Sequence, residues 1–142
     1  MQKEIKVLNV RFNNVTMNEA LDIIFKNIRK NKTGYVCTPN PEILLETEKN
    51  LKYKEVINNS LLNIPDGIGV LWAATHISQK NSKLRALLSL PSIVISPKRF
   101  KKALKERVTG IDLVQKITER AADEGNGLFL LGATPGIGEI AA

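Results

Sequence analysis

The stretch NIPDGIGV, residues Asn63–Val70, joins a short apolar run to the start of a helix. The run from Leu61 to Ile64 predicts a strand. The proline that follows ends this strand, and two glycines then let one backbone segment approach another closely. A turn of this kind would accept Asn or Ser as readily as the acid at its centre. The carboxylate of Asp66 therefore needs its own explanation, either as a cap on the first amides of the next helix or as a reactive group.

The same order of strand, break and helix recurs along the chain. Apolar runs at Tyr35–Cys37 and Leu128–Leu131 predict two more buried strands, each followed by a break. A strand over Glu4–Val10 and a helix opened by the capping box Thr16–Glu19 precede them. Further helices are predicted over residues 41–49, 52–59 and 67–76 and from residue 110 onward. Strands that alternate with helices predict a Rossmann-like α/β fold, a mostly parallel sheet with helices on both faces.

The composition is that of an ordinary domain in a reducing compartment. The 142 residues are 43% apolar, and Cys37 is the single cysteine, so an intramolecular disulfide cannot form. The first residues, MQKEIKVLNV, lack the apolar core of a signal peptide, and no run approaches the roughly 18–20 apolar residues of a membrane span. We therefore expect a cytoplasmic protein. The sequence stops about one turn into a predicted helix, so we expect that a C-terminal part of the domain is missing.

The net charge of +7 is concentrated in one segment. Residues 76–107 hold nine Lys and Arg and one acid, a net charge of +8, whereas the other 110 residues sum to −1. Within this segment, Leu87–Ile95 is largely apolar but too short to span a bilayer. Apolar side chains with flanking bases suit the surface of an anionic membrane. The alternative is a basic α/β module that binds nucleic acid, although the segment lacks interleaved aromatic residues and matches no readout motif.

Candidate site residues come from the breaks after the strands. Ligands bind beyond the carboxyl ends of the strands in parallel α/β sheets, so neighbouring breaks would face one crevice. Thr38, Asn40 and Asp66 would then lie near the helix start at Gly132, where a phosphate could bind. A simpler explanation is that Thr38 and Asn40 only cap the helix that begins at Pro41. The glycines from 132 to 138 lack the spacing of a dinucleotide fingerprint, and the lone histidine has no partner residues for a metal, so no metal site is expected.

Four motifs together resemble the TagA/WecG glycosyltransferase family. They are YVCTPNPEIL (Tyr35–Leu44), NIPDGIGVLWA (Asn63–Ala73), ERVTGIDL (Glu106–Leu113) and LFLLGATPGIGEIAA (Leu128–Ala142), in the order and roughly the spacing of that family. The resemblance implies an inverting transferase that uses a UDP-sugar donor and no cofactor. It would move N-acetylmannosamine, or a related sugar, to N-acetylglucosamine on undecaprenyl diphosphate. The setting would be teichoic acid or surface polysaccharide biosynthesis, with the protein peripheral on the inner face of the cell membrane.

The resemblance also implies roles for single residues. Asp66 matches the base that takes a proton from the acceptor hydroxyl. Thr38 matches a polar pocket residue, with Asn40 beside it. Arg107 matches an arginine suited to anionic phosphate, because its planar fork can hold two oxygens.

The resemblance further implies a domain organisation. Residues 1–142 would be the N-terminal portion of one α/β glycosyltransferase domain. The link between Ala73 and Glu106 is longer than the family pattern leads us to expect, so residues 77–105 are interpreted as a basic and apolar insertion. An open sheet edge would invite pairing with a second chain and would allow a homo-oligomer.

Overall fold

The computed structural model describes residues 4–79, 84, 88–91, 106, 108–131, 134, 137 and 140. Arg107, Gly132 and most of the predicted insertion at 77–105 therefore lie outside the described residues. The described part is a mixed α/β structure with one antiparallel and one parallel pair of strands.

The chain begins with a β-hairpin. Strands β1 (Glu4–Val7) and β2 (Val10–Asn13) pair antiparallel, with Val7 opposite Val10. The prediction of one continuous strand over residues 4–10 is wrong, because Leu8 and Asn9 both adopt positive φ values, 50° and 62°. Two consecutive left-handed residues make the tight turn whose twist matches the twist of the flanking strands.

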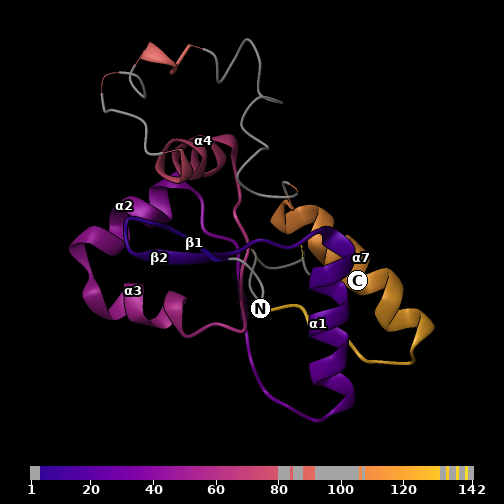
Figure 1. The fold of residues 1–142 in the computed structure, drawn as a ribbon. Helices are drawn as coiled ribbons and strands as arrows, with labels where there is room; N and C mark the ends of the chain where they lie inside the picture. The colour runs from indigo at the N-terminus through magenta and orange to yellow at the C-terminus, as the bar shows by residue number, and fades with distance from the viewer. Residues whose placement is uncertain are drawn as a thin grey trace.

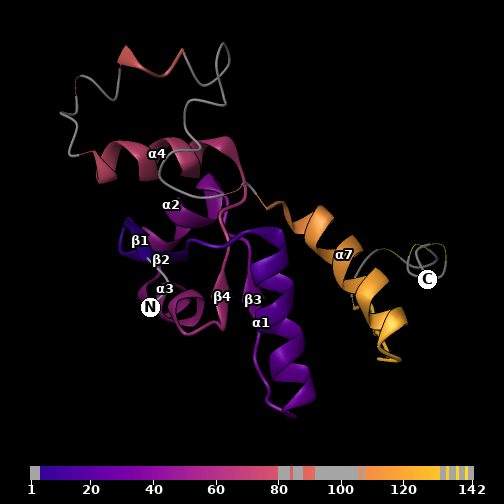
Figure 2. The same ribbon diagram turned by 45° about the vertical axis from the view of Figure 1, so that its right-hand side comes forward.

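A parallel strand pair stands at the centre of the molecule (Figures 1 and 2). Strand β3 (Val36–Cys37) lies beside β4 (Leu62–Asn63), with Cys37 opposite Asn63. Backbone hydrogen bonds continue the pairing on both sides of these short strands. The last of them, from Asp66 N to Pro39 O, measures 3.1 Å. The predicted strands at 35–37 and 61–64 are confirmed, and the breaks that follow them lie side by side.

In the part of the chain that the structure describes, five helices surround the strands, close to where the sequence predicts them. They are α1 (Met17–Arg29), α2 (Pro41–Lys49), α3 (Leu51–Asn58), α4 (Ile68–Ser78) and α7 (Gly110–Asp123). The capping box of α1 is formed in full, with Glu19 N bonded to Thr16 Oγ1 and Thr16 N to Glu19 Oε2. The hairpin lies with α2, α3 and α4 on one side of the parallel pair, and α1 and α7 lie on the other (Figure 2).

Alternation along β4 divides the core into two clusters, because successive side chains of a strand point to opposite faces. Leu62 and Ile64 pack with Phe25 of α1 and Leu113 of α7. On the other face, β1 and β2 pack with α2, α3 and α4. The buried side chains of that cluster include Val10, Phe12, Leu44, Ile57 and Leu71. One face of the parallel pair thus packs with α1 and α7, and the other packs with the hairpin and with α2, α3 and α4.

One predicted strand is not formed. Residues 128–131 have no strand structure, and the side chains of Leu128, Phe129, Leu130 and Leu131 are all exposed. In the described residues each sheet therefore has two strands, and the larger parallel sheet of a Rossmann-like fold is not seen there. Among these residues, no helix is long and apolar enough to cross a bilayer.

Candidate active site

Thr38 and Asp66 lie together at the carboxyl ends of the two parallel strands, and Gly110 lies against both. A Cβ atom placed on Gly110 would lie 3.1 Å from Thr38 Oγ1 and 3.8 Å from Asp66 Oδ2. The Thr38 hydroxyl and the Asp66 carboxylate thus both lie next to the space beside the first residue of α7. Any side chain at position 110 would fill that space, so the glycine keeps it open.

The two glycines that follow Asp66 serve a close approach of helices, as the sequence predicts. Gly67 has a φ of +102°, a conformation that residues with a Cβ atom rarely adopt. A Cβ atom on Gly69 would lie 2.9 Å from Pro41 Cγ, closer than real Cβ contacts come. The first turns of α4 and α2 are therefore packed directly on each other beside Asp66.

Asp66 does not cap α4, so the interpretation of Asp66 as a helix cap is wrong. The N-cap residue of α4 is Gly67, and no side chain accepts a hydrogen bond from the first turn. The Asp66 side chain is partly exposed, and none of the described residues donates a hydrogen bond to it. The carboxylate at this position is thus left for another role.

Asn40 and Thr38 have different structural roles. Asn40 Oδ1 accepts a hydrogen bond of 2.9 Å from Ile43 N, and Asn40 is the N-cap of α2. The capping interpretation is therefore confirmed for Asn40, whereas no such hydrogen bond is seen for Thr38. The structure brings Thr38 and Asp66 together and places Asn40 at the adjacent helix start.

Three helices begin at this place. The first residue of α2, Pro41, contacts the start of α4 at Gly67 and Gly69, and the first residue of α7, Gly110, contacts Thr38 and Asp66. A helix N-terminus carries a partial positive charge, which favours an anion, and the first N–H groups of α4 in addition have no side-chain cap. The converging starts of α2, α4 and α7 therefore provide an environment suited to a negatively charged ligand.

The start of α7 is held in place from two sides. Glu106 Oε2 accepts a hydrogen bond of 2.8 Å from Met17 N at the start of α1, and Val108 is buried in the core. Thr109 caps α7 by accepting a hydrogen bond from Asp112 N. These contacts fix the segment ERVTGIDL so that Gly110 faces the site. Glu106 and Gly110 are not among the predicted site residues; the signal in the sequence that indicates Gly110 is a glycine directly after a capping threonine.

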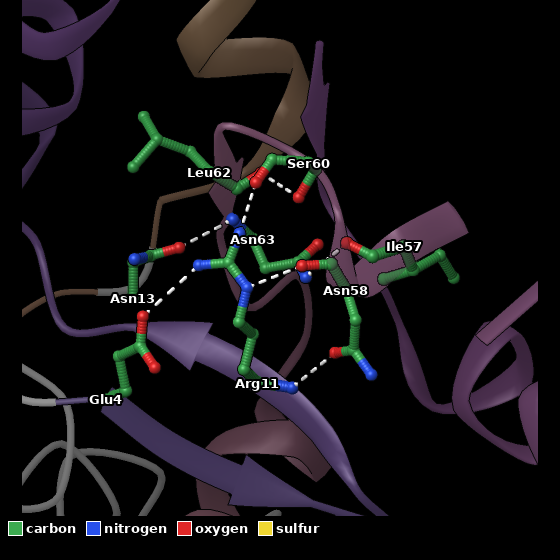
Figure 3. A network of polar contacts seen from close by, with 8 residues as sticks. All are labelled: Glu4, Arg11, Asn13, Ile57, Asn58, Ser60, Leu62 and Asn63. Atoms are coloured by element: carbon green, nitrogen blue, oxygen red, sulfur yellow. Dashed lines mark hydrogen bonds and ion pairs between the residues drawn. The ribbon is translucent and has the colours of Figure 1, made fainter. Parts of the chain in front are cut away.

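The strand that leads to Asp66 is fixed by a network of polar contacts, shown in Figure 3. Arg11 of β2 donates from Nε to Asn58 O at 2.6 Å and from its guanidinium to Ser60 O, and it pairs with Glu4. These bonds tie the hairpin to the connection between α3 and β4.

Fully buried Asn63 continues this network within β4. Asn63 N donates to Asn13 Oδ1 at 2.8 Å, and Asn63 Nδ2 donates to Ile57 O at 2.7 Å. Because Asn63 is three residues before Asp66, the hairpin helps to position the end of β4.

Cys37 of β3 lies near the site but is not an activated nucleophile. Burial raises the pKa of the Cys37 thiol above its ordinary value, and a hydrogen bond with Ser60 opposes this only in part. A raised pKa keeps the sulfur protonated and unreactive at neutral pH. Within the described ranges, no three His, Cys, Asp or Glu side chains are arranged to hold a metal ion.

Two of the predicted site residues, Arg107 and Gly132, lie outside the described part of the chain. For these two residues, only the position in the sequence can be stated. Arg107 stands between Glu106 and Val108, both of which are fixed, and Gly132 follows Leu131. Their predicted roles stay predictions.

Comparison with known proteins identifies relatives over nearly the whole chain. A family model described as "Glycosyl transferase WecG/TagA/CpsF family" matches residues 5–90 and 81–142. A protein of Staphylococcus aureus strain MRSA252, named N-acetylglucosaminyldiphosphoundecaprenol N-acetyl-beta-D-mannosaminyltransferase, is 30% identical over 141 residues. Proteins of the same name from strains NCTC 8325 and COL are 29% identical. Each alignment covers 97% of this chain and 46% of the relative, so the chain spans about half the length of these proteins.

Proposed function

Because the chain belongs to the WecG/TagA/CpsF family of glycosyl transferases, we propose that this protein is a UDP-sugar-dependent hexosyltransferase. It transfers N-acetylmannosamine, or a related sugar, to N-acetylglucosamine linked to undecaprenyl diphosphate. The names of the Staphylococcus aureus relatives support this donor sugar and this acceptor. The product would enter teichoic acid or another surface polysaccharide, made at the inner face of the cell membrane.

The observation that carries the proposal is the place of Asp66 beside Thr38 and Gly110. In an inverting transfer, the acceptor hydroxyl oxygen attacks the anomeric carbon of the donor from the face opposite the diphosphate. The new C–O bond forms as the bond to the diphosphate oxygen breaks, and that oxygen keeps the electron pair. A base must take the proton of the hydroxyl in the same step, which contributes about 10² to 10⁴ in rate. Asp66 is accessible and is not used as a helix cap, so it suits this role.

The groups around Asp66 suit the remaining parts of the reaction. The hydroxyl of Thr38 lies on the same opening and can hydrogen-bond a sugar hydroxyl there. The converging starts of α2, α4 and α7 favour a diphosphate, whose negative charge grows as the sugar leaves. We include Asn40, Arg107 and Gly132 among the substrate-binding residues, with Arg107 in the role of a ligand of the phosphate oxygens.

We propose that residues 1–142 are part of one Rossmann-like glycosyltransferase domain, in which further strands widen the parallel pair β3–β4. Residues 77–105 would be an insertion in this domain. The exposed apolar side chains of residues 128–131 support a wider sheet, because such a run is usually buried.

A direct transfer assay tests the function. The full-length protein is incubated with UDP-N-acetylmannosamine and a short-chain lipid diphosphate that carries N-acetylglucosamine. We expect a lipid-linked disaccharide, and NMR of the new bond should show an anomeric configuration inverted relative to the donor. Retention of configuration would contradict a single displacement with Asp66 as base. No product from this donor or from UDP-linked relatives of it would contradict the transferase function.

A further inference from the structure

The short segment that leads from β2 into α1 holds the strand that ends at Asp66. Asn13 is the last residue of β2, and its Oδ1 atom accepts a hydrogen bond of 2.8 Å from Asn63 N. Both asparagines are buried. Because Asn63 lies three residues before Asp66, the position of this segment sets the position of the end of β4.

The same segment also holds the chain that leads into α7. Four residues after Asn13, Met17 begins α1 and donates its backbone N–H to Glu106 Oε2 at 2.8 Å. This hydrogen bond joins residues that are 89 positions apart in the sequence. Glu106 in turn lies four residues before Gly110, which borders the opening of the candidate site. Two hydrogen bonds from one segment thus fix the two sides of the opening relative to each other.

The first turn of α7 is coupled closely to the part of the chain that Glu106 anchors. Val108 is buried in the core, and Thr109 caps the helix by accepting a hydrogen bond from Asp112 N. The backbone oxygen of Thr109 accepts a second hydrogen bond, of 3.0 Å, from Leu113 N. A shift of the anchored segment would therefore shift the start of the helix.

The rest of α7 is held by contacts that do not involve Glu106. Leu113 is buried in the same core cluster as Phe25 of α1. Arg120 forms an ion pair of 2.8 Å with Asp22 of α1 and lies 4.7 Å from the centroid of the Phe25 ring. The two helices lie on the same side of the parallel strand pair (Figure 2). Loss of the Glu106 carboxylate should thus release the start of α7 and leave the rest of the helix in place.

We propose that Glu106 is a positioning residue for sugar transfer, which holds Gly110 at the distance from Thr38 and Asp66 that lets substrate enter between them. Its carboxylate is bonded to α1, so Glu106 acts through the start of α7 and not on the substrate. A misplacement of about 1 Å at a reacting site can cost about 10² in rate. The inference rests on the proposed function for its expected effect on transfer.

Three variants of the full-length protein separate positioning from stability. Glu106→Ala removes the hydrogen bond from Met17 N. The matched control, Glu19→Ala, removes the hydrogen bond of 2.8 Å from Thr16 N to Glu19 Oε2 in the capping box of the same helix. Each variant loses a carboxylate hydrogen bond at the start of α1, so a loss of stability alone would affect both alike. Glu106→Gln keeps a side-chain oxygen that can accept the hydrogen bond from Met17 N.

Steady-state kinetics with donor and acceptor saturating measures the effect on transfer. We expect kcat of Glu106→Ala to fall about tenfold or more, whereas Glu106→Gln and Glu19→Ala should stay close to the parent. Glu106→Ala combined with Gly110→Ala should lose less activity than the product of the two single losses, because both changes act on the same opening.

Hydrogen exchange of backbone amides tests the positioning without any substrate. In Glu106→Ala, the amides of Asp112 and Leu113 should exchange about tenfold faster than in the parent, because the start of α7 loses one charged hydrogen bond. Glu19→Ala should leave these two amides unchanged.

Unchanged exchange of the two amides in Glu106→Ala would overturn the inference, as would a kcat equally low in Glu19→Ala. A Glu106→Gln variant as slow as Glu106→Ala would also overturn it, since the charge and not the hydrogen bond would then matter. Faster exchange in a protein that transfers no sugar would confirm the anchoring of α7 and contradict the proposed function alone.

Discussion

The backbone N–H of Asp66 donates a hydrogen bond to the carbonyl oxygen of Pro39, at 3.1 Å. This bond extends the pairing of β3 and β4 beyond the last strand residues and holds the two breaks together. Thr38 and Asp66 are thereby placed on one opening, although they are far apart in sequence. The regular pairing of β3 and β4 thus sets where the site lies, and the irregular segments after the two strands provide the side chains of Thr38 and Asp66.

Gly69→Ala should destabilise the protein. The new Cβ atom would lie 2.9 Å from Pro41 Cγ, and a proline ring at a helix start cannot swing away. We expect a loss of about 1–3 kcal/mol in the free energy of unfolding, the range of overpacked cores. Denaturation in urea measures it. Gly127→Ala is the control, because nothing lies within 4 Å of its added Cβ atom. Equal stability of the two variants would contradict the close packing of α2 on α4.

Arg11→Met should also destabilise the protein, by about 2–3 kcal/mol, because charged hydrogen bonds to the carbonyl groups of Asn58 and Ser60 are lost. Glu4→Gln is the matched control. It removes only the exposed ion pair of Arg11, whose contribution is about 0–1 kcal/mol. Urea midpoints of the two variants measure the difference. If Glu4→Gln cost as much as Arg11→Met, the backbone acceptors would not be the important partners of Arg11.

The sequence predicts those parts of the fold whose cause is local. The cap at Thr16 and Glu19 and the pair Asn40–Pro41 start helices through neighbours within a few residues, and both helices are found as predicted. The hairpin was missed because its turn, Leu8-Asn9, has none of the usual glycines. The strand predicted at Leu128–Leu131 is not formed, since apolar character predicts burial only where a partner strand is available.

The sequence predicts the candidate site in part: it predicts the place of Thr38 and Asp66 but not that of Gly110. The breaks that contain Thr38 and Asp66 follow from two strands ended by proline, and parallel pairing then brings them together. Gly110 could not be predicted in the same way, because its contact with Thr38 and Asp66 joins residues distant in sequence. The side from which α7 approaches the site follows from contacts between distant residues, Glu106 with the start of α1 and Arg120 with Asp22 of α1.

Gly110→Ala should lower activity without lowering stability. Alanine is the better helix former, so the free energy of unfolding should stay equal or rise by up to about 1 kcal/mol. The methyl group would stand 3.1 Å from Thr38 Oγ1 and occupy the opening beside Asp66. We expect kcat/KM for sugar transfer to fall about tenfold or more, because a small misplacement of reacting groups is costly. Gly127→Ala again serves as control. A Gly110→Ala variant with the activity of the parent would show that the opening does not hold substrate.

Asp66→Asn should abolish most of the transfer activity and leave the fold unchanged. The amide keeps the size of the side chain but cannot take a proton, so kcat should fall by about 10² or more with donor and acceptor saturating. The melting temperature should stay the same, since no side chain caps α4 and Asp66 accepts no hydrogen bond from the described residues. Asp123→Asn is the control, an exposed acid at the C-terminal end of α7, away from Gly110, that should not affect the rate. Steady-state kinetics of the full-length protein, with calorimetry on the same samples, separates chemistry from folding. A rate close to that of the parent in Asp66→Asn would remove Asp66 from the role of base.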